Sequence, residues 1–173
     1  DLVPSLAPRA AKIAAAVLAA GKSSRMGANK LLMPIKGVPM IARTVDAILA
    51  SPARPIICIT GNANADIEAA LANRDITFVH NPHFAEGLST SLRAGLAALP
   101  NDVDGAIVCL GDMPAVSGAA IAKMVAAFNP AEGRAIIVPA YQGKRGNPVL
   151  FARAYFQEIA AVHGDIGARP VIA

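Results

Sequence analysis

Apolar residues along the chain follow two alternating patterns. Short runs of β-branched and other apolar residues, typical of strands buried on both faces, occupy residues 13–18, 56–60, 76–80, 106–110, 135–140 and 148–151. Between them, apolar positions recur at the 3.6-residue spacing of a helix, at residues 39–50, 65–72, 88–99, 118–128 and 152–162. This alternation predicts an α/β fold, with a mostly parallel sheet and helices on both of its faces.

The composition supports one folded domain. Of the 173 residues, 54% are hydrophobic and 16% are charged, whereas a disordered chain has low hydrophobicity and high net charge. We expect residues 1–12, which contain two prolines and no periodicity, to be a linker or a remnant of a longer chain, and residues 13–173 to form the domain. Because the chain starts at Asp1 without a methionine, we also expect that it was cut from a longer protein.

Charge, hydropathy and cysteine content exclude several classes of protein. The net charge is +4, but Lys and Arg are scattered, so no basic arm for nucleic acid is predicted. The apolar stretch at residues 13–20 is too short to span a bilayer and lacks the flanks of a signal peptide. Cys58 and Cys109 lie inside apolar runs, which indicates buried thiols rather than disulfides or a zinc site. We therefore expect a cytoplasmic protein without a membrane partner.

The segment directly after the first predicted strand, residues 18–30, reads LAAGKSSRMGANK. Its glycines, small residues and cations make a loop whose backbone N–H groups and side chains can hold a polyphosphate. A Walker A loop is excluded because Gly27 is followed by Ala28. A dinucleotide fingerprint is excluded because Ser23 stands where its second glycine belongs. The segment is therefore a phosphate loop of another type.

This loop resembles the first motif of nucleotidyltransferases that activate sugars, polyols and pterins, L-A-[AG]-G-x-[GS]-x-R-[ML]-G-x-x-K. The matching residues are Leu18, Ala19, Ala20, Gly21, Ser23, Arg25, Met26, Gly27 and Lys30. Further motifs in the expected order resemble the MobA-like group, and most of all its molybdenum cofactor cytidylyltransferases. They are NPHFAEGLSTSLRAG (81–95), CLGDMP (109–114), GKRGNPVLF (143–151) and GDIGAR (164–169).

The resemblance implies a Rossmann-like fold, Mg²⁺ dependence, and transfer of CMP from CTP to the phosphate of molybdopterin cofactor with release of pyrophosphate. Ala20 stands where the guanylyltransferase branch commonly has glycine, which favours a pyrimidine nucleotide. The family usually continues beyond residues 164–169 into a further strand and an acidic helix start, but this chain stops at Ala173. Besides CTP and molybdopterin cofactor, the expected partner is a molybdopterin-handling domain or molybdoenzyme chaperone, in fusion or in contact.

Candidate catalytic residues follow from the chemistry of this transfer. The acceptor phosphate is ionised at neutral pH, so catalysis rests on positioning and on neutralising the charge of the leaving pyrophosphate. Arg25 and Lys30 suit that role. Asp112, one glycine after an apolar strand, is the first candidate ligand for Mg²⁺, and Asp165 in GDIGAR is the second. For both aspartates, a helix cap or turn is the ordinary alternative.

Candidate binding residues lie in the other motifs. For the nucleotide they are Leu18, Ala19, Ala20, Gly21, Asn81, Ser89, Thr90 and Ser91, together with Arg25 and Lys30. A plain helix start is the alternative for the serines. The family assigns the segment at residues 143–151 to the acceptor, so Arg145, Asn147 and Pro148 are the candidates there.

Three other functions remain as alternatives. A guanylyltransferase or a sugar-phosphate nucleotidyltransferase would share the same loop. An NAD-dependent oxidoreductase of Rossmann type is disfavoured because the glycine fingerprint is missing. A nucleotide-binding domain without turnover is disfavoured by the joint presence of Arg25, Lys30 and Asp112.

Overall fold

The computed structural model describes residues 11–20, 30–61, 64–113, 116–141, 144–145 and 148–161. Its main sheet consists of β1 (Ile13–Ala19), β4 (Ile56–Thr60), β5 (Thr77–His80), β6 (Gly105–Leu110), β7 (Ile136–Ile137) and β10 (Val149–Ala152). The α-helices are α1 (Met40–Leu49), α2 (Asn64–Ala70), α3 (Leu88–Ala97), α4 (Gly118–Ala127) and α5 (Phe156–Ala160). Short 3-10 helices follow at η2 (Lys30–Leu32), η3 (Phe84–Glu86), η4 (Pro130–Glu132) and η5 (Arg153–Tyr155).

The six strands lie in the order β5-β4-β1-β6-β10-β7. The strands β5, β4, β1 and β6 pair in parallel, and β10 pairs antiparallel with both β6 and β7. The mostly parallel sheet expected from the sequence is therefore confirmed. Because β1 pairs in parallel with both β4 and β6, the carboxyl ends of all three strands lie at the same edge of the sheet.

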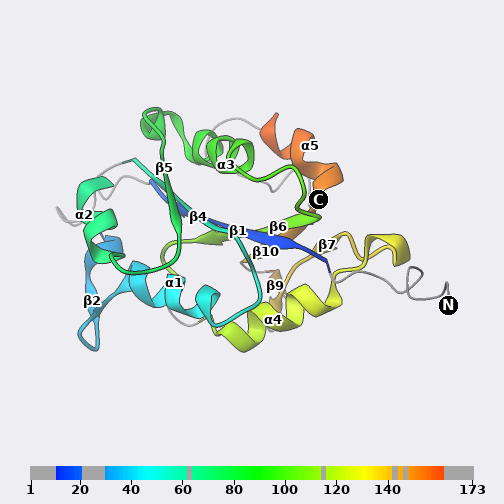
Figure 1. Cartoon of the computed structure of the whole chain (residues 1–173), viewed down its shortest axis with the longest axis horizontal. Coiled ribbons are helices and arrows are strands. Elements are labelled where there is room, and N and C mark those ends of the chain that lie inside the picture. The colour runs from blue at the N-terminus through cyan, green and yellow to red at the C-terminus, as the bar shows by residue number, and fades with distance from the viewer. Residues whose placement is uncertain are drawn as a thin grey trace, which may run out of the picture.

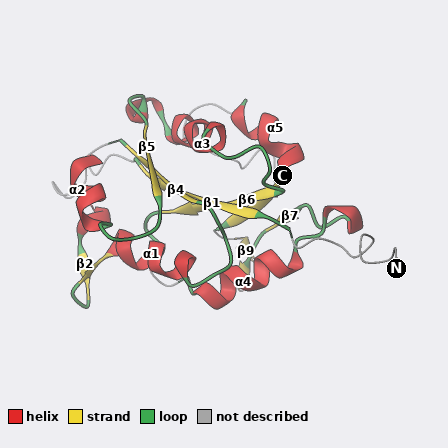
Figure 2. Cartoon of the chain, in the orientation of Figure 1, coloured by secondary structure: helices red, strands yellow, loops and turns green. Residues whose placement is uncertain are grey.

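Helices cover both faces of the sheet, with α3 and α5 on one side and α1 and α4 on the other (Figures 1 and 2). Successive residues of β1 point to opposite faces, so Ala15 packs in the cluster with α1 and α4, and Ala16 packs in the cluster with α3 and α5. Small residues permit the helices to pack closely on the sheet. A Cβ at Gly95 of α3 would lie 2.8 Å from Cδ1 of Ile59 in β4.

Two predicted strands differ in burial and extent. A strand buried on both faces is predicted at residues 76–80, but β5 is an edge strand whose Thr77 and His80 are exposed. The strand predicted at residues 135–140 is shorter, since β7 covers two residues. Its last residue instead belongs to β8 (Ala140–Tyr141), which pairs with β9 (Lys144–Arg145). Apolar runs indicate a strand but do not indicate where it stands in the sheet.

The predicted helix at residues 152–162 begins later than expected. Ala152 is still a strand residue, because it pairs with Gly105 of β6 and its N–H donates to the carbonyl of Ala135 at 2.8 Å. A 3-10 turn then leads into α5 at Phe156. The first residues of the expected helix are therefore used to extend the sheet.

A hairpin precedes α1 that the apolar pattern does not predict. It is formed by β2 (Pro34–Ile35) and β3 (Val38–Pro39), and its turn has positive φ at Lys36 (53°) and Gly37 (83°). Arg43 of α1 donates from Nε to the carbonyl of Ile35 at 2.7 Å, which ties the hairpin to the helix. Its strands are too short to leave a periodic signal.

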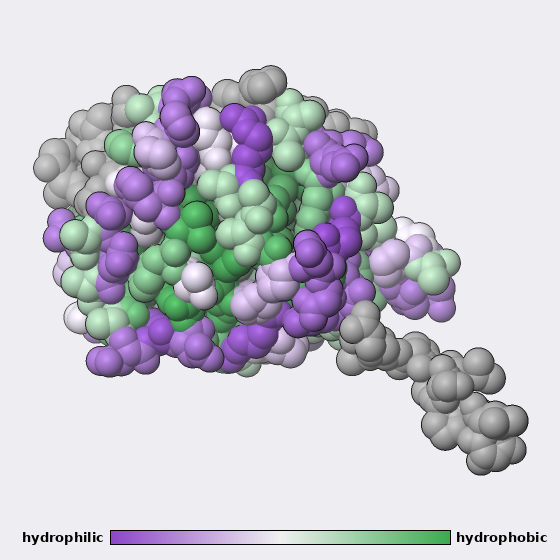
Figure 3. All heavy atoms as spheres, turned by 45° about the horizontal axis from the view of Figure 1, so that its top comes forward, coloured by the Kyte–Doolittle hydropathy of each residue, from purple (hydrophilic) through white to green (hydrophobic). Residues whose placement is uncertain are grey.

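The surface is mixed in character. On the face shown in Figure 3, hydrophobic residues gather in the centre and hydrophilic residues surround them. Within the described ranges, the helices are all too short or too polar to cross a membrane.

Candidate functional site

The carboxyl ends of the central strands bring several candidate residues to one edge of the sheet. β1 leads through Leu18 to Ala20, and β6 leads through Leu110 to Asp112. Leu18 pairs with Leu110, and the N–H of Gly111 then donates to the carbonyl of Leu18 at 3.0 Å. The strand pairing therefore continues to the residue directly before Asp112.

Lys30 and Asp112 meet at this edge. The Lys30 Nζ lies 3.3 Å from Asp112 Oδ2, although 82 residues separate them in sequence. The two side chains are 57% and 37% exposed, so solvent weakens their attraction and the pair adds little to stability. A phosphate ligand can therefore reach both groups from the solvent side.

Thr44 supports the turn that carries Asp112, a role that the apolar pattern and the motifs do not predict. Its hydroxyl donates to the carbonyl of Gly111 at 2.9 Å and accepts from the N–H of Met113 at 3.2 Å. Thr44 is 1% exposed. The signal was present, because it is a polar residue at the 3.6-residue spacing of Ile41 and Ile48, on the apolar face of the predicted helix.

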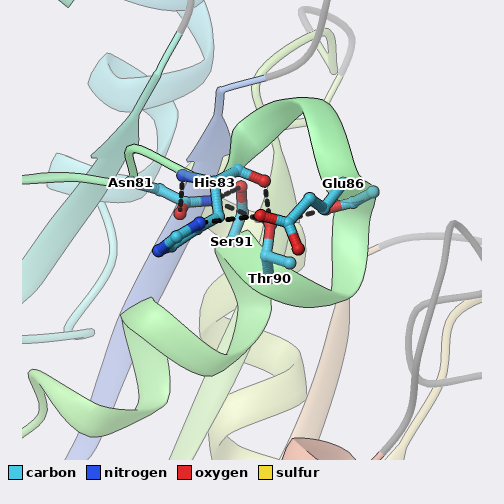
Figure 4. Close-up of polar contacts among 6 residues, drawn as sticks. Asn81, His83, Glu86, Thr90 and Ser91 are labelled. Carbon is cyan, nitrogen blue, oxygen red and sulfur yellow. Dashed lines mark hydrogen bonds and ion pairs between the residues drawn. The ribbon is translucent and has the colours of Figure 1, made fainter.

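The segment from β5 to α3 is held by a polar network (Figure 4). The Asn81 Nδ2 donates to the hydroxyls of Thr90 and Ser91, at 2.9 Å each, and its Oδ1 accepts from the N–H of His83 at 2.9 Å. Asn81 is 3% exposed. Its side-chain amide is thus engaged inside the protein, where it connects the end of β5 to the first turn of α3.

Two exposed polar side chains complete the same segment. His83 Nδ1 lies 2.7 Å from Oε2 of Glu86, and their side chains are 68% and 66% exposed (Figure 4). The hydroxyl of Thr90 lies 2.8 Å from the carbonyl of Gly87, toward which it donates. These contacts fix the approach to α3.

Ser89, in the first turn of α3, has an unusual environment. Its Oγ is buried and has no hydrogen-bond partner within the part of the chain that the structure describes, and the residue is 1% exposed. Buried hydroxyls are normally paired. The N-cap residue of α3 is Gly87, with φ of 123°. Because glycine has no side chain, it caps none of the first N–H groups of the helix.

Ala20 packs beside Gly61 and Phe84. A Cβ at Gly61 would lie 2.5 Å from Cβ of Phe84 and 2.9 Å from Cβ of Ala20. Ala20 is 2% exposed and belongs to the apolar cluster under α3. Its methyl group therefore sets how closely the segment carrying Phe84 approaches the end of β1.

Several predicted site residues cannot be placed. Gly21, Arg25, Asn147 and Asp165 lie outside the described residues. Arg145 is described only as part of the backbone of β9, and Pro148 is buried just before β10.

Neither cysteine is a candidate nucleophile. Cys58 and Cys109 are both fully buried in the sheet, and both are free. Burial raises the pKa of each thiol from 9.0 to about 12, so both remain protonated at neutral pH. Their interpretation as buried thiols is confirmed.

Asp112 is the carboxylate that the structure places beside Lys30 at the ends of β1 and β6. Among the described residues, no group of three or more His, Cys, Asp or Glu side chains is placed to hold a metal ion. Mg²⁺ commonly uses only one or two protein carboxylates, with substrate phosphates and water as its other ligands. The exposed Asp112 carboxylate, which already has the Lys30 ammonium beside it, fits that pattern.

Comparisons with known proteins agree with this geometry. The Escherichia coli (strain K12) molybdenum cofactor cytidylyltransferase is 30% identical over 138 residues, which are 79% of this chain and 68% of that protein. The bifunctional protein GlmU of Sphingopyxis alaskensis is 32% identical over 147 residues, 82% of this chain, which spans only 31% of that protein.

The solved structures agree as well. Rv0371c from Mycobacterium tuberculosis H37Rv has a TM-score of 0.84 and 30% identity, and the match covers 95% of this chain and 83% of that one. A structure of Rv0371C described as a complex with manganese has a TM-score of 0.76 and 28% identity, covering 93% and 82%. Residues 15–173 match the family described as the MobA-like NTP transferase domain. The chain therefore belongs to the MobA-like NTP transferase family, and it is a nucleotidyltransferase.

Proposed function

We propose that this nucleotidyltransferase transfers CMP from CTP to the phosphate of molybdopterin cofactor and releases pyrophosphate. The observation that carries the proposal is the meeting of Lys30 and Asp112, 3.3 Å apart, at the carboxyl ends of β1 and β6. This edge is where parallel α/β sheets bind ligands. The LAAG sequence at residues 18–21 and the E. coli relative support CTP and the molybdenum cofactor as the substrates.

The reaction is a displacement at the α-phosphorus of CTP. An oxygen of the acceptor phosphate forms a new P–O bond there, and the bond to the oxygen that bridges to the β-phosphorus breaks. The electron pair leaves with pyrophosphate. No residue has to remove a proton, because the attacking oxygen is already ionised at neutral pH. The protein must instead align the two substrates and stabilise negative charge on the leaving group.

Lys30 supplies a positive charge for that leaving group, and Arg25 is proposed to share the role as a planar fork. The Lys30 side chain is 57% exposed beside Asp112, so a phosphate oxygen of the nucleotide can approach its ammonium from the solvent. When the substrates are bound, the lysine would then contact the nucleotide and the aspartate would bind a cation.

We propose Mg²⁺ as the metal, with Asp112 and Asp165 as its protein ligands. When bound, the ion adds positive charge at the phosphates and helps to orient them. Asp112 offers a hard oxygen donor at the strand end, and its Oδ2 already faces a cationic group in this structure.

For the base of CTP, we propose contact with the backbone of Leu18, Ala19, Ala20 and Gly21 and with the start of α3. The unpaired buried Oγ of Ser89 supports a role in recognition, because a ligand group would supply its missing partner. Asn81 and Ser91 are also proposed to contact the nucleotide, and the bond from the Asn81 amide to the Ser91 hydroxyl holds α3 in place beside it.

Acceptor binding remains assigned to Arg145, Asn147 and Pro148. Arg145 lies in β9, and Pro148 lies just before β10, on the side of β6 away from β4. We also keep the proposals of a single transferase domain over residues 13–173, a cytoplasmic location, and contact with a molybdopterin-handling domain or molybdoenzyme chaperone.

The proposal is tested by pyrophosphate release. The purified chain is incubated with molybdopterin cofactor, Mg²⁺ and one of CTP, GTP, ATP or UTP, and parallel reactions replace the cofactor with sugar phosphates. We expect CTP with molybdopterin cofactor to give the highest kcat/KM. Preference for GTP would favour the guanylyltransferase alternative, and release only with sugar phosphates would refute the pterin acceptor.

A further inference from the structure

Asp112 is the first residue of its segment that lies beyond the backbone hydrogen bonds of the sheet. The pairing of β6 with β1 ends with the bond from the Gly111 N–H to the Leu18 carbonyl, at 3.0 Å. Beyond this point the direction of the Asp112 side chain depends on the two peptide groups that flank its Cα. A carboxylate that must meet a ligand needs these two groups to be fixed.

One buried hydroxyl contacts both of those peptide groups. The Thr44 Oγ1 donates to the Gly111 carbonyl at 2.9 Å, which belongs to the peptide before Asp112. The same oxygen accepts from the Met113 N–H at 3.2 Å, which belongs to the peptide after it. Thr44 comes from α1, 67 residues away from Gly111 in sequence, so the helix holds the turn across the two layers.

The packing around the turn leaves it little freedom to shift. A Cβ at Gly111 would lie 3.0 Å from Cδ1 of Ile41, 3.1 Å from Cδ2 of Leu31 and 3.2 Å from the Leu18 carbonyl oxygen. The turn is therefore pressed against α1, η2 and β1. Thr44, one helical turn after Ile41, lies on the same side of α1 and supplies the polar contact in an otherwise apolar setting.

We propose that Thr44 is a positioning residue, whose hydroxyl sets the orientation of the Asp112 carboxylate toward a divalent cation. This rests on the proposed role of Asp112 as a metal ligand. Thr44 itself is buried, and it acts through the turn.

The experiment uses Mn²⁺ as the probe, with its binding to the full chain measured from the free Mn²⁺ signal in electron paramagnetic resonance. Thr44→Val keeps the shape and removes the hydroxyl, and we expect it to weaken Mn²⁺ binding by about 10-fold or more. Thr44→Ser keeps the hydroxyl, and we expect an affinity within about twofold of the parent. The Mn²⁺ concentration for half-maximal pyrophosphate release should rise by the same factor in Thr44→Val.

Ser51 provides a matched control at the other end of α1. Its hydroxyl donates to the Ile48 carbonyl at 2.6 Å and accepts from the Ala53 N–H at 3.3 Å, and the residue is 6% exposed. Ser51→Ala therefore removes the same kind of double contact, but from backbone groups of Ile48 and Ala53 rather than from the turn that carries Asp112. We expect it to lower the unfolding temperature, as Thr44→Val does, while Mn²⁺ affinity stays at the parent value.

The outcomes separate the two proposals. If Thr44→Val lowers stability but binds Mn²⁺ like the parent, Thr44 is a structural residue and the positioning role is overturned. If Asp112→Asn itself binds Mn²⁺ like the parent, Asp112 is not a ligand, and both its proposed role and that of Thr44 fail. Should Thr44→Val not fold, the Mn²⁺ affinity of Thr44→Ala is compared with that of Thr44→Ser instead.

Discussion

At the scale of single residues, the site depends on charges that remain accessible. Lys30 and Asp112 are both partly exposed, and their mutual contact contributes little to folding. The polar residues of the surrounding framework are instead buried, since Thr44, Asn81 and Ser89 are all at least 97% buried. A buried frame thus carries a few charged groups that reach the solvent.

Lys30→Ala tests the role of the lysine. We expect kcat to fall by about 100- to 1,000-fold, because charge stabilisation at comparable sites contributes roughly 3–4 kcal/mol to the transition state. Pyrophosphate release measures the rate, and circular dichroism checks that the fold is kept. Lys123→Ala, which removes an equal charge from an exposed position on α4, is the control and should retain the parent rate. A Lys30→Ala enzyme with near-parent kcat would remove Lys30 from the mechanism.

Ala20→Gly tests the choice of nucleotide. Loss of the methyl group leaves space beside Gly61 and Phe84, and we expect the segment carrying Phe84 to shift and the CTP preference to relax toward GTP. One methyl group discriminates by roughly 1–3 kcal/mol, so the ratio of kcat/KM for CTP and GTP should change by about 10-fold or more. Ala16→Gly removes a methyl group from the same face of β1 but from mid-strand, and it should leave the ratio unchanged. An unchanged ratio in Ala20→Gly would contradict the role given to this position.

At the scale of elements, close packing between loops and strand ends fixes the site. Gly61, directly after β4, lies under Phe84 of η3 with no room for a side chain. The network from Asn81 to Thr90 and Ser91 holds the same segment from the side of α3. The start of α3 is therefore positioned both by apolar contact and by hydrogen bonds.

Gly61→Ala should disturb this arrangement. The new Cβ would lie 2.5 Å from Cβ of Phe84, close to the backbone, so the whole segment must move rather than one flexible side-chain end. We expect the free energy of unfolding to fall by about 1–3 kcal/mol, as for other overpacked sites. Gly95→Ala meets mainly the flexible end of Ile59 and should cost less. Urea denaturation of both variants makes the comparison, and equal losses would contradict the tight contact at Gly61.

The sequence predicts the centre of the sheet better than its edges. The apolar runs that become β1, β4 and β6 are buried on both faces, so local pattern and tertiary environment agree. β5 also contains an apolar run but stands at the edge, and position in a sheet is not encoded locally. Residues near Ala152 join the sheet instead of the helix because β6 and Ala135 provide partners for their backbone.

The candidate site is predicted in part. Lys30 and Asp112 follow from motifs placed after strands, and the structure brings them together. Thr44 is missed because one threonine within an apolar helix face gives no sign of which backbone it will contact. For Asn81, the motif predicts contact with a ligand, which stays a prediction, and the structure adds the bonds from its amide to Thr90 and Ser91.

At the scale of the whole molecule, the buried thiols should make the free energy of unfolding decrease as the pH rises into the alkaline range. Burial raises the pKa of Cys58 and of Cys109 to about 12, above the 9.0 of an exposed thiol. The unfolded chain therefore loses these protons at lower pH than the folded protein does. Their contribution to stability is fully present below pH 9 and is lost as the pH rises toward 12.

Cys58→Ala/Cys109→Ala should show a weaker dependence of stability on pH over this range. The double variant is less stable at neutral pH because it leaves small cavities. Its free energy of unfolding should nevertheless fall less steeply than that of the parent between pH 9 and 12. Urea denaturation at several pH values gives both slopes, and identical slopes would show that the thiols do not titrate on unfolding in this range.

The most direct test of the proposed reaction follows the phosphorus atoms of CTP. The chain is incubated with molybdopterin cofactor, Mg²⁺ and CTP labelled with ³²P at either the α- or the γ-position, and the products are separated. We predict that the α-label moves to the cofactor in a cytosine dinucleotide and that the γ-label leaves as pyrophosphate. Release of the γ-label as free phosphate, or an α-label that stays on CMP without joining the cofactor, would contradict nucleotidyl transfer to this acceptor.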